Sequence, residues 1–495
     1  MVAWRPHLHV WLALGVAALS CLSVAVGTAV GLDERQTILL AGAVAIGVPV
    51  AYLLWYEEPA YVLTGAVALS PFAANWEAMG IPGYLAMDRL LLTFGIAMVL
   101  LRAPCVRDRP KLRMYGAHWM LGAAAAYVVV SAAVAGTLTN PPAIFRLVDS
   151  FGILPFLVFA VAPFAFRTHR QRQILLGGLV SLGAYLGVTA LCERLNLDPL
   201  IFPQYILDPT VGSHFGRARG PFVEASTNGL GLFACVCAAA VAVLVWESRR
   251  LRILAGSVGV LCLVTTFFTM QRNVWLATVL GSFLLLACIR DARRFVLPAV
   301  AIAVTVLTTA MFLSPTLRAQ VQERQDENIS VEGRKNMNRA AVNMIEARPL
   351  IGFGWNRYFD ENIPYFEQSP DYQLIGADVD QVHNVILHYT AELGLVGISL
   401  WGLGLFLMVG GAVTSRSRGD VRYWAQALPA LAGFVVLTIA FTPPKPFAAL
   451  IISLWAGVVW SSRYEEQPRP GRGRTGVRRL SLRSEPPRAR VPAPG

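Results

Sequence analysis

Three arginines lie in short polar segments at the edges of long apolar runs. Arg217 and Arg219 precede one such run, and Arg272 separates two others. A guanidinium binds two phosphate oxygens at once through its fork of N–H groups, so each arginine is a candidate ligand for a phosphate or diphosphate. The alternatives are lipid contact at the membrane boundary for Arg217 and Arg219, and for Arg272 a side chain that snorkels to the interface beside Trp275.

A histidine near a carboxylate forms a second candidate centre. His383 follows Asp380 and precedes Asn384, immediately before an apolar run. Imidazole titrates near neutral pH, so His383 can take a proton from a hydroxyl group while Asp380 orients the ring. We name His383 as a candidate general base, with Asp380 and Asn384 as supporting candidates. The alternative is a polar boundary residue, which is the commoner role of a single histidine.

A polar stretch over residues 333–339 is predicted to be helical, and Gly352 and Gly354 then permit a tight turn. A Gly-x-Gly pattern that follows no strand does not define a nucleotide site. Arg334 is a candidate substrate contact, although a solvated helix face is the simpler interpretation. No zinc-type spacing of cysteine and histidine is present, so we predict no metal and no cofactor.

The composition places these candidates in a membrane protein. Of the 495 residues, 55% are hydrophobic and 15% charged, and the mean hydropathy is +0.54. These values exclude an ordinary water-soluble globular protein. The net charge of +12 resides in short clusters between apolar runs and in a basic tail, which argues against nucleic-acid binding. The predicted fold class is therefore all-α, a polytopic membrane helix bundle.

Apolar runs of about 20 residues predict about fourteen transmembrane helices. They lie near 9–30, 37–56, 59–75, 86–102, 115–136, 148–166, 173–192, 227–246, 252–270, 274–289, 295–314, 390–413, 424–441 and 446–461. The large loop before the twelfth of these spans carries His383.

Lysine and arginine gather in alternate loops, and cytoplasmic loops carry such an excess. The basic loops are 102–113, 167–172, 249–252, 290–294, 416–422 and the tail from 463 onward. We therefore predict a cytoplasmic (inner) membrane protein with both termini cytoplasmic and the candidate site extracytoplasmic. The predicted regions are an N-terminal bundle 1–192, an outward loop 193–226, central helices 227–314, a large outward loop 315–389, C-terminal helices 390–461 and a disordered basic tail 462–495, which can contact membrane lipid.

Together these segments resemble the O-antigen ligase and O-antigen polymerase superfamily. The matching pieces are 217–228, Arg272 before Trp275, 333–354 and 383–397, which span roughly 210–410. The resemblance implies a metal-independent membrane glycosyltransferase with a polyprenyl-diphosphate-linked glycan donor and a glycan or lipid-linked acceptor. It implies that Arg217 and Arg272 hold the diphosphate, and that His383 deprotonates the acceptor hydroxyl for an inverting attack. Arg219 is near enough to Arg217 to exchange roles with it.

Two departures from the family pattern leave the subfamily open. Residues 224–226 stand where many members have an Asn-Pro-Asn-like turn, and His388 stands where glutamine is common. A polymerase is slightly favoured over a ligase, because the predicted spans outnumber those expected of a ligase. The alternatives are a transporter or flippase of anionic or lipid-linked sugars, and an inactive scaffold that binds other polysaccharide assembly or export proteins.

Overall fold

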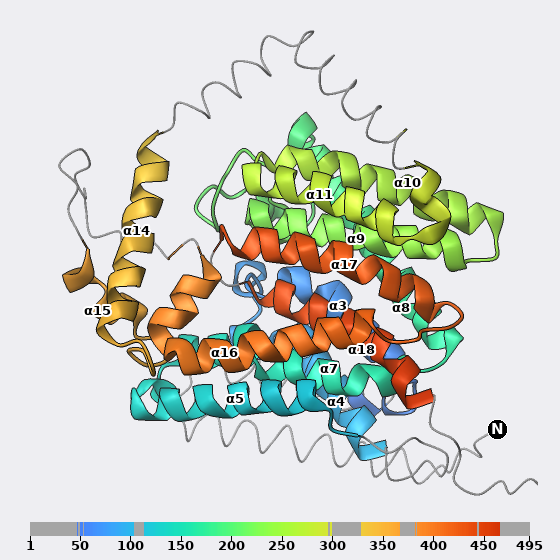
Figure 1. Cartoon of the computed structure of the whole chain (residues 1–495). Helices are drawn as coiled ribbons and strands as arrows, with labels where there is room; N and C mark the ends of the chain where they lie inside the picture. Colours follow the sequence, from blue (N-terminus) through green and yellow to red (C-terminus); the bar gives the residue numbers. More distant parts are fainter. Residues whose placement is uncertain are drawn as a thin grey trace, which may run out of the picture.

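The protein is a bundle of helices. The computed structural model describes residues 50–52, 54–102, 113–295, 328–366, 384–442 and 445–465, with the single residues 47, 298 and 382. All regular elements within these ranges are helices (Figure 1), which confirms the all-α class. Seven helices of the described residues are long and apolar enough to cross a membrane, and two shorter apolar helices accompany them. The chain is thus a polytopic membrane helix bundle.

Most of the predicted spans coincide with a helix. The helices are α3 (Pro59–Leu69), α4 (Met87–Arg102), α5 (Gly116–Val134), α6 (Pro141–Arg146), α7 (Ile153–Ala165), α8 (His169–Leu195), α9 (Ala225–Val245), α10 (Arg249–Thr266), α11 (Arg272–Cys288), α14 (Asn328–Ala347), α15 (Tyr358–Glu361), α16 (Val385–Val413), α17 (Val421–Ile439) and α18 (Pro446–Glu465). A π-helical turn, η6 (Leu147–Phe151), leads from α6 towards α7. The predicted spans near 9–30, 37–56 and 295–314 lie wholly or mostly outside the described residues, so the total of about fourteen stays a prediction.

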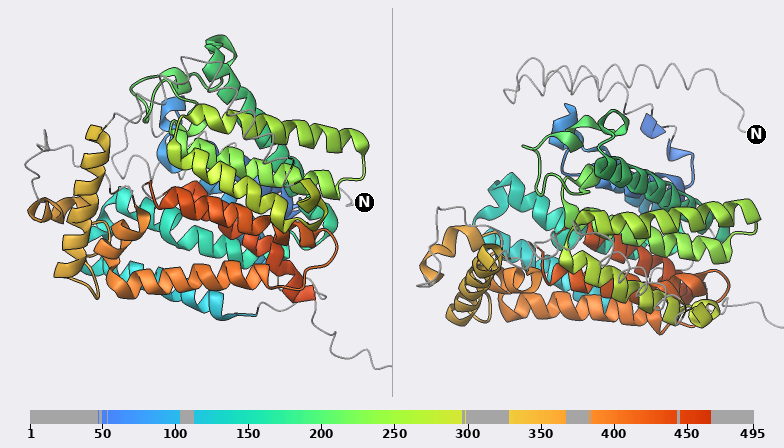
Figure 2. Two further views of the ribbon diagram at one scale, coloured as in Figure 1. Left: turned by 45° about the horizontal axis from the view of Figure 1, so that its top comes forward. Right: turned by 90° about the horizontal axis from the view of Figure 1, so that it is seen from above.

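The long helices run side by side, and α14 stands across one end of the bundle (Figures 1 and 2). The most extensive helix pairs are α9 with α10, α11 with α17, α5 with α16 and α7 with α18. In α9 and α18, 78% and 89% of the apolar stretch is buried inside the protein, so these two helices form the centre of the bundle. Their neighbours present apolar side chains outward, as lipid-facing helices do.

Side-chain caps explain where three of the long helices begin. The Glu224 carboxylate accepts hydrogen bonds from the backbone N–H groups of Ser226 and Thr227 at the start of α9. Asn384 accepts from two backbone N–H groups in the first turn of α16. Thr168 and Gln171 form a capping box at the start of α8. Each cap satisfies donors that have no partner within the helix, and so it fixes the first turn.

Three of the predicted cytoplasmic loops meet at one end of the bundle. Arg172, at the start of α8, forms a two-point ion pair with Asp420 before α17, with N–O distances of 2.7 and 2.8 Å. Arg422, at the start of α17, lies 3.7 Å from Asp291 beyond α11. The basic loops 167–172, 290–294 and 416–422 are therefore neighbours, which the alternating-side prediction requires. Below, this end is called the basic end, and the other end the site end.

Candidate functional site

Arg219 holds together the loop that precedes α9. Its guanidinium is buried, with 1% of the residue exposed. The side chain donates to the backbone carbonyls of Ile206, Val211 and Asp208, at 2.7 Å from Nη2 to Ile206 and 2.7 Å from Nη1 to Val211. The Glu193 carboxylate accepts from the backbone N–H of Arg219 at 2.7 Å. These carbonyls occupy the guanidinium, so a diphosphate would have to displace them.

We expect Arg219→Ala to destabilise the fold, because it leaves buried carbonyls without a donor. The free energy of unfolding should fall by about 2–4 kcal/mol. Thermal unfolding of the purified protein in detergent measures the change. A variant as stable as the wild type would contradict this structural role and return Arg219 to the list of diphosphate ligands.

The segment with Arg217 lies against the turn that precedes Arg272. The backbone N–H of Ala218 donates to the Phe268 carbonyl at 3.0 Å. The buried Asn228 side chain, from the first turns of α9, donates to the Ala218 carbonyl at 3.1 Å. Arg217 is half-buried and Arg272, the first residue of α11, is exposed. Two cations that are far apart in the sequence are thus carried on backbone segments that touch each other at the site end.

A lysine from the turn between α17 and α18 joins this region. Lys445 Nζ lies 3.4 Å from the Glu224 carboxylate, the same group that caps α9. Burial raises the pKa of the Glu224 carboxyl, but the Lys445 ammonium and hydrogen bonds from Thr227 more than offset it, so the pKa lies below its usual value. The Glu224 carboxyl therefore stays ionised at neutral pH. It fixes the α17–α18 turn beside the start of α9.

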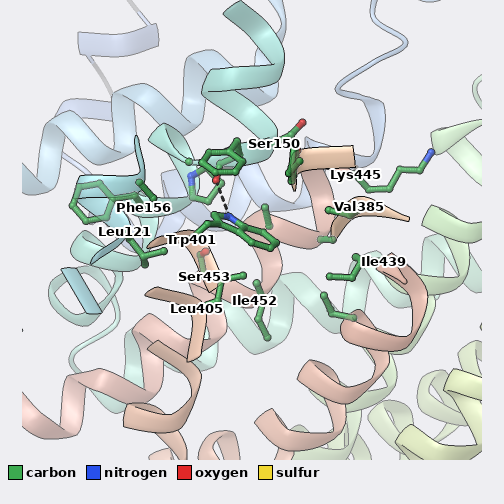
Figure 3. Close-up of a pocket in the computed structure, with 18 residues that line it drawn as sticks. Leu121, Ser150, Phe156, Val385, Trp401, Leu405, Ile439, Lys445, Ile452 and Ser453 are labelled. Carbon is green, nitrogen blue, oxygen red and sulfur yellow. Dashed lines mark hydrogen bonds between the residues drawn. The ribbon is translucent and has the colours of Figure 1, made fainter. Parts of the chain in front are cut away.

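An apolar cavity extends from Lys445 between α5, α7, α16, α17 and α18 (Figure 3). Its walls include Leu121, Phe156, Trp401, Leu405, Ile439 and Ile452. Val385 and Tyr389, in the first turns of α16, line it near the site end, and Ser150 of η6 contributes a hydroxyl. The cavity volume is about 60 Å³, so it suits a short apolar segment of a lipid-like molecule.

His383, the predicted base, and Asp380, its predicted partner, lie outside the described residues. Val382 and Asn384, on either side of His383, are described. Asn384 Oδ1 accepts from the Ile386 and Leu387 N–H groups, at 2.9 and 3.1 Å, so this side chain is engaged as a helix cap. The backbone of Arg334 lies in α14, as the helical prediction for 333–339 requires, and the structure does not describe its side chain.

The structure adds two charged residues that the candidate site did not include. Glu392 of α16 has no exposed surface, and its carboxylate forms an ion pair with Arg146 of α6. His388 Nε2 lies 3.5 Å from the same carboxylate. In the sequence, the signal for this ion pair was the Glu392 carboxylate itself, because a glutamate inside an apolar run requires a buried partner. The sequence does not reveal that partner, because 246 positions separate it from Glu392.

The positions just described lie in or beside the part of the chain that matches a known family. Residues 257–402, from within α10 to within α16, match the family model described as O-antigen ligase. Residues 257–402 are an O-antigen ligase family domain. This domain contains Arg272, Arg334, His383 and Glu392, whereas Arg217 precedes it and touches it through the bond between Ala218 and Phe268. No curated protein matches the sequence significantly.

Enzymes with this domain are multi-pass membrane proteins of the ligase or polymerase type, and they assemble surface polysaccharides from lipid-linked glycans. The resemblance inferred from the four segments is therefore confirmed over residues 257–402. The roles of individual residues rest on the geometry.

Proposed function

We propose that this protein transfers a glycan from a polyprenyl diphosphate to a hydroxyl group of an acceptor, at the extracytoplasmic face of the cytoplasmic membrane. The observation that carries the proposal is the contact between Ala218 and Phe268, which joins the Arg217 segment to the turn before Arg272. Two guanidinium groups on adjoining segments can bind a ligand that has two negative centres, such as a diphosphate.

The transfer step needs a cationic site and a base. Arg217 and Arg272 hold the diphosphate and stabilise the negative charge that grows on it as the bond from the anomeric carbon to its oxygen breaks. His383 takes the proton from the acceptor hydroxyl, whose oxygen forms the new bond to the anomeric carbon with inversion. The products are the extended glycan, the polyprenyl diphosphate and the protonated histidine. In this proposal the transfer needs no metal ion, so activity persists in excess EDTA.

The cavity in Figure 3 supports a lipid-linked donor. The cavity walls come from five helices and are largely apolar. Lys445 lies at the part of the cavity that approaches the start of α9. Burying isoprene units against these walls contributes binding free energy at roughly 25 cal/mol per Å² of apolar surface. In this arrangement the carrier lipid lies in the cavity, and the sugar lies outside the membrane beside the arginines.

Between the two reactions of this family, we propose polymerisation rather than ligation. The predicted span count favours it, because about fourteen spans exceed the number expected of a ligase. A polymerase and a ligase share the chemistry at the donor and differ in the acceptor, which is a second lipid-linked glycan for the polymerase.

Cells that lack the protein distinguish the candidate functions. We expect them to accumulate single lipid-linked repeat units, and we expect the wild-type gene to restore long polymer. Finished polymer that remains on its carrier lipid would instead identify a ligase. Repeat units confined to the cytoplasmic leaflet would identify a flippase or transporter, and would contradict the proposal. The measurement is glycan chain length and attachment, by gel electrophoresis and mass spectrometry of extracted carrier lipid.

A further inference from the structure

Helix α16 is interrupted near its site end. Gly394 has φ 65° and ψ −175°, which is not helical, and a Cβ at this position would lie 2.2 Å from the Leu350 carbonyl oxygen. Residues 385–393 therefore form an outer half-helix, separate in direction from the rest of α16. This outer half-helix begins two residues after His383 in the sequence, and it contributes Val385 and Tyr389 to the cavity wall.

The segment 349–354 replaces the helical hydrogen bonds lost at this break. The N–H groups of Phe353 and Gly354 donate to the carbonyls of Ala391 and Glu392, at 3.0 and 2.8 Å. On the far side of the break, the Leu395 N–H donates to the Pro349 carbonyl at 2.8 Å. Gly352, at φ 68°, permits this close approach, because a Cβ there would lie 2.5 Å from the Glu392 carbonyl. The outer half-helix is thus attached to the 349–354 segment through its backbone.

The ion pair between Arg146 and Glu392 attaches the same half-helix to the N-terminal helices. The Arg146 guanidinium also lies 4.5 Å over the Trp355 ring, and the Trp355 indole donates to the Ala143 carbonyl at 2.9 Å. The Tyr358 N–H approaches the Glu392 carboxylate at 3.4 Å. Because the carboxylate is fully buried, losing its partner would leave an uncompensated charge, and the half-helix would have to move to relieve it.

We infer that the Arg146–Glu392 ion pair is a positioning device for the transfer reaction. It fixes the outer half-helix of α16, whose cap Asn384 follows His383 in the sequence, relative to the cavity. This inference rests on the proposed function, because it gives the half-helix a role in the reaction. Arg217 and Arg272 are carried by other segments, the loop before α9 and the start of α11. The pair therefore acts on the rate of transfer.

The chain offers a matched control at the basic end. Arg172 and Asp420 also form a buried ion pair between distant segments, with side-chain exposures of 6% and 10%, against 18% and 0% for Arg146 and Glu392. Asp420→Asn breaks that pair without touching the site end. Asp420→Asn and Glu392→Gln each remove one carboxylate charge, so the two variants perturb the fold in a comparable way.

The test is steady-state kinetics of purified variants with a lipid-linked donor. Glu392→Gln should lower kcat by about 100-fold, the scale expected of a misplacement of about 1 Å. Asp420→Asn should lower the unfolding temperature without changing kcat. Arg146→Lys, which keeps the positive charge, should retain more of kcat than Arg146→Gln.

Other outcomes would overturn the inference. Equal kinetics for Glu392→Gln and Asp420→Asn would show that the pair only stabilises the bundle, as would loss of the fold in both Glu392→Gln and Arg146→Gln. A rise in KM for the donor with kcat unchanged would also contradict it. The wild-type protein, measured in parallel, separates this failure from that of the proposed function, since no transfer by the folded wild type would reject the proposed function itself.

Discussion

Replacing His383 by alanine is expected to lower the rate of glycan transfer by about 10²–10⁴-fold, the usual contribution of a positioned general base. Without the imidazole, the acceptor hydroxyl must lose its proton to water, and its oxygen is a weaker nucleophile while it keeps that proton. The loss should appear in kcat, with KM for the donor unchanged, since the diphosphate is held by arginines on other segments. Steady-state kinetics at matched membrane expression measure it.

His169→Ala is the matched control for this substitution. His169 begins α8 at the basic end, where its ring lies 3.2 Å from Asp420, and more than half of its side chain is exposed. The His169→Ala variant should transfer glycan at the wild-type rate. Wild-type transfer by His383→Ala would remove the histidine from the mechanism.

Arg272→Ala should lower kcat/KM by about 10²–10³-fold, the effect of removing one preorganised donor from a developing oxyanion. Arg272 begins α11, and the turn before it holds the Arg217 segment through the Phe268 carbonyl. Arg272 is exposed, so its replacement leaves no buried group unsatisfied. A charge-preserving Arg272→Lys should recover part of the loss, because lysine keeps the charge but offers no two-point fork.

Arg290→Ala controls for the general effect of removing an exposed arginine. Arg290 follows the other end of the same helix, at the basic end. Its replacement should leave kcat/KM unchanged. If Arg272→Ala and Arg290→Ala behaved alike, the Arg272 side chain would be an interfacial anchor beside Trp275, and the diphosphate would bind elsewhere.

The helices could largely be predicted because lipid demands long apolar runs. The predicted spans at 115–136 and 227–246 agree closely with α5 and α9, whose composition alone separates them from polar loops. The start of α16 was less predictable: the helix begins at Val385, before the predicted 390, because the Asn384 side chain caps an additional turn. Such a turn includes polar residues and is not detected by an apolar window.

The sequence signal for the candidate site was a charge that stood out against apolar surroundings. Arg217 and Arg272 were singled out in this way and their roles stay a prediction, although the structure places their segments in contact. The sequence could not separate Arg217 from Arg219, because the difference depends on carbonyls of residues 206–211 that fold back around Arg219. Nor could it pair Arg146 with Glu392, since that contact forms only when α6 packs against α16. Such pairs are tertiary contacts, and the spacing of residues in the sequence does not predict them.

The most direct test of the central claim uses the purified protein alone in liposomes with a polyprenyl-diphosphate-linked repeat unit and excess EDTA. We predict longer lipid-linked glycans, with one polyprenyl diphosphate released for each bond formed, and a rate about 10²–10⁴-fold lower with His383→Ala. If the folded wild-type protein left the substrate unchanged but moved it from one leaflet to the other, this result would contradict transfer and identify a transporter.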